Sequence, residues 1–274
     1  MTVTAAAPPS GGSLHSADSW QHLAGDWTAG GIDGAGPPEH YEREWIFGFG
    51  SLIWHPGVPV AESVKPCFVE GYRRVFWQGS TDHRGTPAAP GRTVTLEPCE
   101  GAVTWGAAFR LAGDAAQRHR TWHYLEWREK EYDGRTEVEV VCPPAGDAGE
   151  PRRLRALTFI ATSDKSRNRN YLGPAPVEQI AQQIASSRGP SGPNHEYLFR
   201  LTDAVRGMGV RDEELFLLEG KVRARLQLLE LSGAAGAAAA TAAEAAAGAA
   251  TAAADGAGSD GGEQRPAAAE TLQR

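Results

Sequence analysis

Hydrophobic residues between positions 44 and 162 fall into short runs that predict β-strands. Trp45 to Phe49 has the aromatic and aliphatic content of a buried strand, and residues 137–141 alternate acid and valine, which is typical of a strand with one face in water. Proline and glycine break these runs, so residues 55–66 are expected to form a loop and residues 98–101 a turn. The other predicted strands cover residues 71–78, 92–96, 103–111 and 154–162.

Most of the remaining hydrophobic residues recur at helix spacing. Asp114 opens a predicted helix that reaches about residue 130. Pro176 stands at a favoured first helical position, and Asn194 and Asp212 are suited to cap two further helices. The apolar stripes of these last three helices contain Val177, Ile180, Ala181 and Ile184; Tyr197, Leu198, Leu201 and Val205; and Leu215, Leu218, Val222, Leu226 and Leu229. Strands first and helices last favour an α+β domain over alternating βαβ units.

The two ends of the chain lack this patterning. Residues 1–43 are rich in Gly, Pro, Ser and Ala, and residues 233–274 consist mostly of Ala, Gly and Thr without an aromatic residue. Neither segment offers enough apolar surface to offset the entropy cost of folding, so both are predicted to be disordered tails. One folded domain is expected over residues 44–232, a length that supports a sizeable core.

Charge follows the same division. The two tails hold ten acids and three bases, which is the whole net charge of −7, and residues 44–232 hold 24 acids and 24 bases. A neutral domain with acidic tails argues against nucleic acid or an anionic membrane as a partner and favours small-molecule chemistry. The three cysteines, Cys67, Cys99 and Cys142, have no metal-ligand spacing and do not indicate a disulfide framework. With no signal-peptide pattern at the N-terminus, a cytoplasmic location is expected.

Gly48 and Gly50 interrupt the first predicted strand and are followed by Ser51. A hydrophobic strand that runs into a turn of small residues exposes main-chain N–H groups, and such a turn suits a carboxylate or another small anion. On these residues alone, a bulged core strand remains the favoured interpretation.

Five segments together resemble the ChaC family of γ-glutamylcyclotransferases, in its glutathione-specific branch. The resemblance runs from about Trp45 to Leu226, nearly the whole predicted domain. The segments are Phe47-Gly-Phe-Gly-Ser-Leu-Ile-Trp54, Arg74-Val-Phe-Trp-Gln-Gly-Ser-Thr-Asp-His-Arg-Gly85, Tyr124-Leu-Glu-Trp-Arg-Glu129, Asn170-Tyr-Leu-Gly-Pro-Ala-Pro176 and Gly189-Pro-Ser-Gly-Pro-Asn-His-Glu-Tyr-Leu198.

The resemblance implies a compact β-barrel with flanking α-helices and a substrate cavity at one end of the barrel. It implies an enzyme, a carbon–nitrogen lyase, that cleaves glutathione into 5-oxoproline and cysteinylglycine without a metal or an organic cofactor. In that reaction the α-amino group of the substrate attacks its own γ-glutamyl carbonyl. The enzyme therefore needs a base and a pocket that enforces the cyclising conformation, and it needs no nucleophile of its own. A monomer is expected.

Glu129 is the residue that the resemblance identifies as the catalytic base. Its place near the end of the predicted helix fits, because the helix dipole raises the pKa of a carboxyl group there. The competing interpretation is an exposed helix-end glutamate that pairs with Arg128 or Lys130. Glu126 and Glu131 are nearby carboxylates outside the matching position.

The glycine-rich turn is the substrate-binding segment that the resemblance implies. It contains Ile46, Phe47, Gly48, Phe49, Gly50 and Ser51, whose N–H groups would hold the γ-glutamyl moiety. The family pattern has tyrosine between the two glycines, where this chain has Phe49. If the turn acts through its main chain, the missing hydroxyl matters little; if that hydroxyl orients the substrate, activity or selectivity changes.

Four further residues are candidates with open alternatives. Arg84 is expected either to contact a substrate carboxylate or to pair with Asp82. Tyr124 and Tyr171 either line the cavity or are core aromatics. His83 beside Asp82 is not expected to form a catalytic dyad, because adjacent strand residues face opposite ways and no nucleophile accompanies them.

Two other functions remain in competition with glutathione cleavage. The same chemistry could act on other γ-glutamyl amides or peptides. A non-catalytic γ-glutamyl-binding module is the second, although a pure binding site has no need of the base at Glu129.

Overall fold

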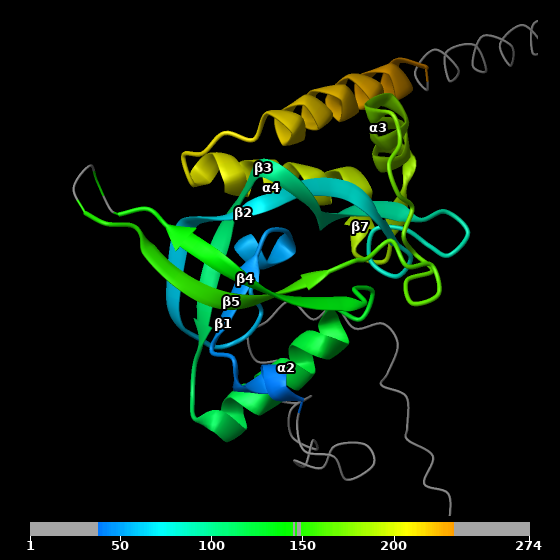
Figure 1. The fold of residues 1–274 in the computed structure, drawn as a ribbon. Coiled ribbons are helices and arrows are strands. Elements are labelled where there is room, and N and C mark those ends of the chain that lie inside the picture. The colour runs from blue at the N-terminus through cyan, green and yellow to red at the C-terminus, as the bar shows by residue number, and fades with distance from the viewer. Residues whose placement is uncertain (1–37, 145, 147–148, 233–274) are drawn as a thin grey trace, which may run out of the picture. The chain divides into compact units, whose positions relative to one another are not determined.

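The computed structural model describes residues 38–144, 146 and 149–232, and its centre is a closed five-stranded barrel (Figure 1). The strand order is β1-β3-β2-β4-β5, and a parallel pairing of Ile46 with Leu157 joins β1 to β5. The α+β barrel expected from the sequence is confirmed. The strands are β1 (Trp45–Gly48), β2 (Val60–Ser80), β3 (Gly91–Leu111), β4 (Gly134–Cys142) and β5 (Arg152–Ile160).

Strands β2 and β3 form one antiparallel hairpin that is longer than the sequence pattern predicts. The expected loop over residues 55–66 is wrong from Val60 onward, because the register shifts between Val64 and Cys67 and so places Pro66 in a bulge, where its missing N–H breaks no ladder. The expected turn over residues 98–101 is also wrong. Strand β3 continues through these residues. Glu70 of β2 pairs with Val103 and Tyr72 pairs with Pro98, so the residues of β3 between Pro98 and Val103 form a bulge.

Helix α2 (Ala115–Arg128) packs against one side of the barrel. Asp114 caps it as predicted: its carboxylate accepts from the N–H of Gln117, whose side chain accepts from the N–H of Asp114 in return. The fully buried Trp122 and Leu125 join residues of β1, β3 and β5 in the main hydrophobic cluster. The helix ends at Arg128, and Glu129 is its C-cap.

The expected N-terminal tail, residues 1–43, includes a short segment that packs on the domain. A 3₁₀ turn, η2 (Glu39–Glu42), places Tyr41 in the core with only 3% of its surface exposed, and the Tyr41 ring stacks on Trp122 at 6.5 Å. One buried aromatic ring is enough to anchor this turn, and the surrounding Pro, Gly and Glu residues hide that signal in the sequence. The rest of the predicted tails, residues 1–37 and 233–274, lies outside the described residues.

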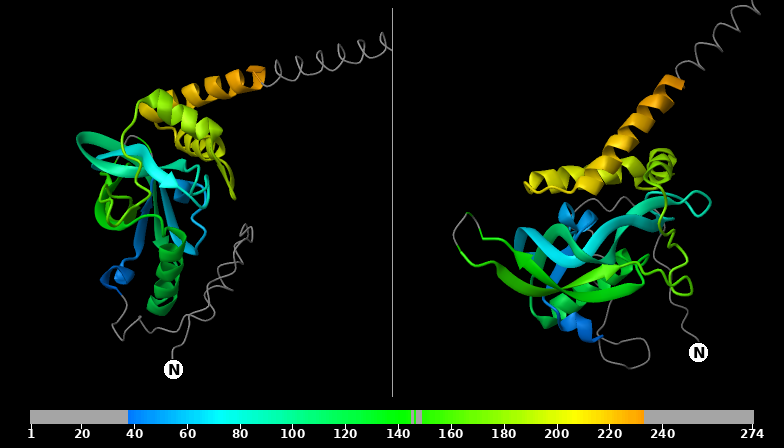
Figure 2. Two further views of the ribbon diagram at one scale, coloured as in Figure 1. Left: turned by 90° about the vertical axis from the view of Figure 1, so that its right-hand side faces the viewer. Right: turned by 45° about the horizontal axis from the view of Figure 1, so that its top comes forward.

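Helices α3 (Val177–Ser186) and α4 (Asn194–Gly207) lie on the side of the barrel opposite α2 (Figures 1 and 2). Pro176 precedes α3 as its N-cap instead of occupying its first position. Asn194 does not cap α4 as predicted. Its side chain is fully buried and accepts from the N–H of Arg92 at 2.7 Å and donates to the carbonyl of Arg92 at 2.9 Å, which ties α4 to β3. The short strands β6 (Arg188–Gly189) and β7 (Gly192–Pro193) connect the two helices.

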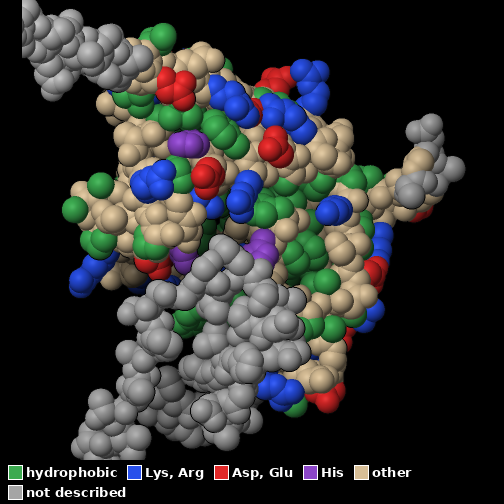
Figure 3. Space-filling view, turned by 180° about the vertical axis from the view of Figure 1, so that it is seen from behind, with side chains coloured by type: hydrophobic (Ala, Val, Ile, Leu, Met, Phe, Trp, Pro, Cys, Tyr) green, Lys and Arg blue, Asp and Glu red, His purple; other side chains and the backbone are tan. Residues whose placement is uncertain are grey.

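After α4, a further helix covers residues 213–232 and begins with the predicted cap, because Asp212 accepts from the N–H of Leu215 at 3.0 Å. The chain divides into two compact units, residues 1–225 and 226–274. Within the described ranges, no helix is long and apolar enough to cross a membrane. On the face seen in Figure 3, acidic and basic side chains are intermixed, in keeping with the equal numbers of acids and bases in residues 44–232.

Candidate active site

The strand-to-turn segment that follows β1 depends on its two glycines. A Cβ at Gly48 would lie 2.6 Å from Cβ of Leu52, and a Cβ at Gly50 would lie 2.9 Å from the hydroxyl of Tyr197. Both distances are shorter than side chains tolerate, so the glycines allow the chain's own side chains to approach the backbone closely. The bulged-strand interpretation is therefore incomplete. Residues 48–51 form a tight turn, here called the glycine corner, which Leu52 and Tyr197 pack from two sides.

The corner continues into the 3₁₀ turn η3 (Ser51–Ile53). Its carbonyls accept within the turn, since Ile53 N–H donates to Gly50 O at 3.0 Å and His55 N–H donates to Ser51 O at 2.9 Å. The first N–H groups of a helical turn have no acceptor inside the turn, and in η3 these are the N–H groups of Ser51 and Leu52. These N–H groups are the donors that an anion at this corner would meet.

Glu129 lies across from this corner, at the C-terminal end of α2. Its N–H donates to Leu125 O at 2.8 Å, which fixes the backbone, and 13% of its side chain is exposed. The carboxylate borders a cavity of about 30 Å³. The cavity is lined by Phe47, Phe49, Gly50, Ser51, Leu52, Glu129, Tyr132, Thr158 and Phe159.

The competing interpretation of Glu129 is wrong in its exposure, because the carboxylate is largely buried, but the ion pair with Arg128 that it expected at the helix end is present. Burial raises its pKa above the ordinary value of 4.5. The guanidinium of Arg128, 3.2 Å away, acts in the opposite direction, and the negative charge of Glu131 raises the pKa further. Burial dominates, so Glu129 is a carboxylate that holds a proton more readily than an exposed one.

Arg128 connects the buried carboxylate to the loop after the glycine corner. Its guanidinium donates to Pro56 O at 2.7 Å and to His55 O at 2.9 Å, and reaches the Ser51 hydroxyl at 3.3 Å. One arginine therefore fixes the distance between Glu129 and the corner. The sequence motif contains Arg128, but its spacing gave no reason to assign it this role.

Two tyrosines near the cavity were missed as site residues. Tyr132 lines the cavity and donates its hydroxyl to Val94 O at 2.9 Å, and burial holds its pKa well above the usual value. Tyr197, which the helix pattern placed only on an apolar stripe, directs its hydroxyl toward Gly50. The position of Tyr132, three residues after Glu129, is a signal that could have been used.

Three predicted substrate residues lie away from the cavity lining. Arg84 donates to Glu196 at 3.2 Å and to the Pro193 carbonyl at 3.0 Å, and so its ion-pair partner is not Asp82. The Tyr124 ring lies beside Trp127, 5.8 Å away, and the Tyr171 hydroxyl donates to Glu97 at 2.7 Å. Substrate contact by these three residues stays a prediction.

The other predicted substrate residues divide into two groups. Phe47, Phe49, Gly50 and Ser51 line the cavity. Ile46 belongs to the hydrophobic core with 1% exposure, and Gly48 packs on Leu52. The last two hold the corner in place, and direct contact with substrate stays a prediction for both.

His83 has a hydroxyl neighbour that the sequence did not indicate. Ser191 Oγ lies 3.2 Å from Nδ1 of His83, so the expectation that no nucleophile accompanies this histidine is wrong. Asp82 lies 3.7 Å from Nε2, which is beyond hydrogen-bond reach, and its carboxylate instead binds Lys130 at 2.8 Å. The three residues therefore lack the geometry of a catalytic triad.

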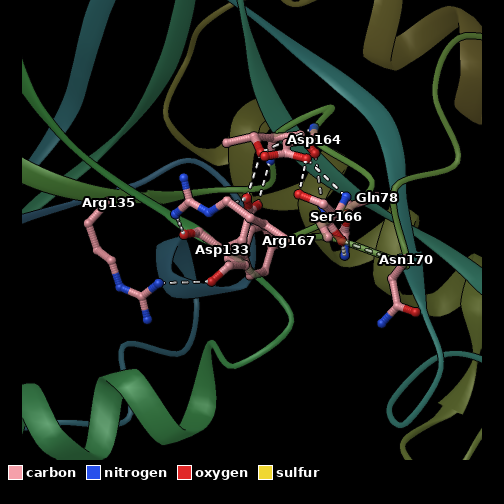
Figure 4. Close-up of polar contacts among 10 residues, drawn as sticks. Gln78, Asp133, Arg135, Asp164, Ser166, Arg167 and Asn170 are labelled. Atoms are coloured by element: carbon pink, nitrogen blue, oxygen red, sulfur yellow. Dashed lines mark hydrogen bonds and ion pairs between the residues drawn. The ribbon is translucent and has the colours of Figure 1, made fainter.

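A polar cluster holds the connection between Glu129 and β4 against the loop after β5. Asp133 accepts from the N–H of Thr162 at 2.7 Å and from its hydroxyl at 2.5 Å, and Arg167 donates to Asp133 O at 2.9 Å. Figure 4 shows Asp133 and Arg167 together with Asp164 and Ser166, and Gln78 and Asn170 beside them. The position of Glu129 is thus set on both sides, by α2 and by this cluster.

The fold and cavity define an α+β barrel protein with a buried carboxylate beside a glycine-rich corner. Residues 44–225 match the family model described as ChaC-like protein, and the chain belongs to that family. The resemblance drawn from the five motifs is confirmed. Across the described ranges, no group of three or more His, Cys, Asp or Glu side chains is arranged to hold a metal ion.

Named relatives support the same placement. The chain is 48% identical to gamma-glutamylcyclotransferase 2-3 of Arabidopsis thaliana over 65% of its length and 88% of that protein. It is 44% identical to human glutathione-specific gamma-glutamylcyclotransferase 1 over 62% of its length and 74% of that protein. Among solved structures, a yeast gamma-glutamylcyclotransferase specific to glutathione matches with a TM-score of 0.58 and 31% identity, over 65% of this chain and 95% of the yeast chain.

Replacing the buried carboxylate with a neutral amide of equal size should stabilise the protein at neutral pH. Because the folded-state pKa of Glu129 is raised, its contribution to stability is full below the unfolded value of 4.5 and is lost as pH rises through the folded value. Glu129→Gln should therefore melt at a higher temperature than the wild type near neutral pH, and the difference should vanish below 4.5. A variant that is less stable at neutral pH would contradict a buried, destabilising charge.

Proposed function

We propose that this protein is a γ-glutamylcyclotransferase specific for glutathione, which it converts to 5-oxoproline and cysteinylglycine. The observation that carries the proposal is the buried Glu129 carboxylate facing the glycine corner in one cavity. The names of its relatives support the substrate, since the human and yeast proteins are both named for glutathione. No water is consumed in this reaction, which makes it a lyase reaction and not a hydrolysis.

Glu129 is the base in the proposed mechanism. Its carboxylate takes a proton from the α-ammonium group of the substrate, and the freed amine attacks the γ-carbonyl carbon. The new C–N bond closes the five-membered ring, and the bond to the cysteine nitrogen breaks. The protonated Glu129 then returns this proton to the leaving nitrogen. The ring nitrogen loses its second proton as the lactam forms, and the released amine takes that proton up as an ammonium group, so the two protons lost by the α-ammonium group equal the two gained by the cysteine nitrogen. A raised pKa suits both steps, because catalytic proton transfer is most efficient when the pKa lies close to the operating pH.

The glycine corner binds the α-carboxylate of the substrate in the proposed mechanism. In the proposed complex the N–H donors around Ser51 bind the α-carboxylate. The hydrogen bonds of Arg128 to Ser51 and His55, which connect the corner to the residue beside Glu129, support this proposal. The α-amine next to that carboxylate then faces the base. Holding the amine near the γ-carbonyl supplies much of the rate, because ring closure depends on orientation.

The cavity must enlarge when substrate binds. A volume of about 30 Å³ corresponds to about one water molecule, which is far smaller than a γ-glutamyl group. Phe47 and Phe49 form part of its wall, with 0% and 5% of their surface exposed. The proposed active state is therefore a more open form of the same cavity.

The proposed setting is the cytoplasm, where glutathione keeps thiols reduced. A monomer is part of the proposal. Activity on other γ-glutamyl amides or peptides is the first alternative. Binding without turnover is the second, and the burial of a base with a raised pKa argues against it.

Purified protein incubated with glutathione should release equal amounts of 5-oxoproline and cysteinylglycine. Glu129→Gln should lower kcat by about 10²-fold or more, the loss typical of a missing acid–base group. Glu139→Gln is a matched control, because Glu139 is an exposed residue of β4 and should leave activity unchanged. Undiminished turnover in Glu129→Gln would overturn the mechanism. Faster turnover of other γ-glutamyl compounds in a substrate panel would overturn the glutathione assignment.

Restoring the hydroxyl at position 49 should have a small effect. Phe49 lines the cavity with 5% exposure, and the proposed grip uses main-chain donors that a ring substituent does not alter. Phe49→Tyr should change kcat/KM for glutathione by less than about threefold, where tenfold corresponds to about 1.4 kcal/mol. A gain of tenfold or more would show that a tyrosine hydroxyl orients the substrate, and that the main chain alone is an incomplete anchor.

A further inference from the structure

Glu131 lies two residues beyond Glu129 and is a junction between three segments of the chain. Its Oε1 accepts from the N–H of Thr81 at 3.0 Å and from the Thr81 hydroxyl at 2.9 Å. The side-chain amide of Asn170 approaches the same oxygen at 3.4 Å. The carboxylate thus joins the end of α2 to the loop after β2 and to the loop after β5.

The backbone of Glu131 is held as firmly as its side chain. Its carbonyl accepts from Nε2 of Gln78 at 2.9 Å, and Gln78 is fully buried. The other end of the Gln78 amide accepts from Asn168 at 2.9 Å. A buried amide pair with all of these bonds made is costly to disrupt, because each broken bond leaves a polar group unsatisfied.

The connection from Glu129 to Asp133 therefore has little freedom. Arg128 fixes its start, Glu131 its middle and the Asp133 cluster its end. Among these three anchors, Glu131 is the one whose side chain binds Thr81 in the loop after β2. Its negative charge also acts on Glu129. That combination distinguishes it from an ordinary structural residue.

We propose that Glu131 is a positioning residue for the reaction: it fixes the connection that carries Glu129 and supplies a negative charge beside it. This inference rests on the proposed function, in which Glu129 acts as the base. Glu131 itself does not line the cavity and is not assigned a contact with substrate.

The charges around Glu131 come from two elements. Asp82 faces Glu131 from the loop after β2, and burial, together with the negative charge of Asp82, raises the pKa of Glu131. His83 of the same loop acts instead on Glu129, whose pKa it lowers, and Lys130 and Glu129 belong to the connection itself. Lys130 binds Asp82 at 2.8 Å. Burial raises the pKa of Glu129 most, and the charge of Glu131 adds to that rise. Removing the charge should therefore lower the pKa of Glu129.

Two substitutions separate the positional role from the charge. Glu131→Gln keeps an oxygen that accepts from Thr81 and removes the charge. Glu131→Ala removes both. The kcat/KM for glutathione is measured against pH for each, with Glu139→Gln as the exposed control and with the folded fraction checked by thermal unfolding.

Glu131→Gln should move the acidic midpoint of the profile to lower pH, because the base ionises more easily, and should keep most of its maximal rate. Glu131→Ala should lower kcat by about tenfold to a hundredfold in folded protein, the cost of a base displaced by about 1 Å. A merely structural role would lower the unfolding temperature without moving the midpoint. An unmoved midpoint in Glu131→Gln, together with wild-type kcat in Glu131→Ala, would overturn the proposal.

A second readout does not need turnover. The NMR shift of the Glu129 carboxyl carbon, assigned by its loss in Glu129→Gln, should titrate at lower pH in Glu131→Gln than in the wild type. An identical titration would overturn the charge effect. If the wild type does not act on glutathione but this titration still moves, the proposed function has failed and the effect of Glu131 on Glu129 stands.

Discussion

The burial of one carboxylate, Glu129, beside the guanidinium of Arg128 is the interaction on which the rest of the site depends. Burial opposes the charge on Glu129, and the arginine partly offsets that cost. The balance leaves a carboxyl group with a raised pKa, and a base transfers protons most efficiently when its pKa lies close to the operating pH. Because the same guanidinium binds the carbonyls of His55 and Pro56, the electrostatic balance and the geometry of the glycine corner share one residue.

The barrel makes this arrangement possible by holding both partners rigidly. The corner leaves β1 at a point packed by Leu52 and Tyr197, which require glycine at positions 48 and 50. Glu129 leaves α2 where the helix ends, and its connection to β4 is bound by Gln78 and Asp133. Two short segments from different parts of the chain thus face each other across a small cavity with little freedom in either backbone.

Much of the fold could be predicted from the sequence, because strand-like runs, caps such as Asp114 and helix stripes are local signals. The errors arose where a distant contact overrides the local pattern. Pro66 is tolerated because a bulge forms against β3, Tyr41 is ordered by Trp122, and Asn194 binds Arg92 instead of its own helix. In the site, Glu129 and the corner followed from motifs. The roles of Arg128 and Glu131 depend on partners between 39 and 77 residues away in sequence, which no spacing rule reveals.

The central claim is that the amine of the substrate meets Glu129 while its carboxylate meets the corner. The most direct test is a crystal structure of the Glu129→Gln variant with glutathione bound. The α-amino nitrogen should lie within hydrogen-bond reach of the carboxamide at position 129, about 2.6–3.2 Å, with the α-carboxylate against the N–H groups around Ser51. A γ-glutamyl group bound outside this cavity, or one whose amine points away from position 129, would contradict it.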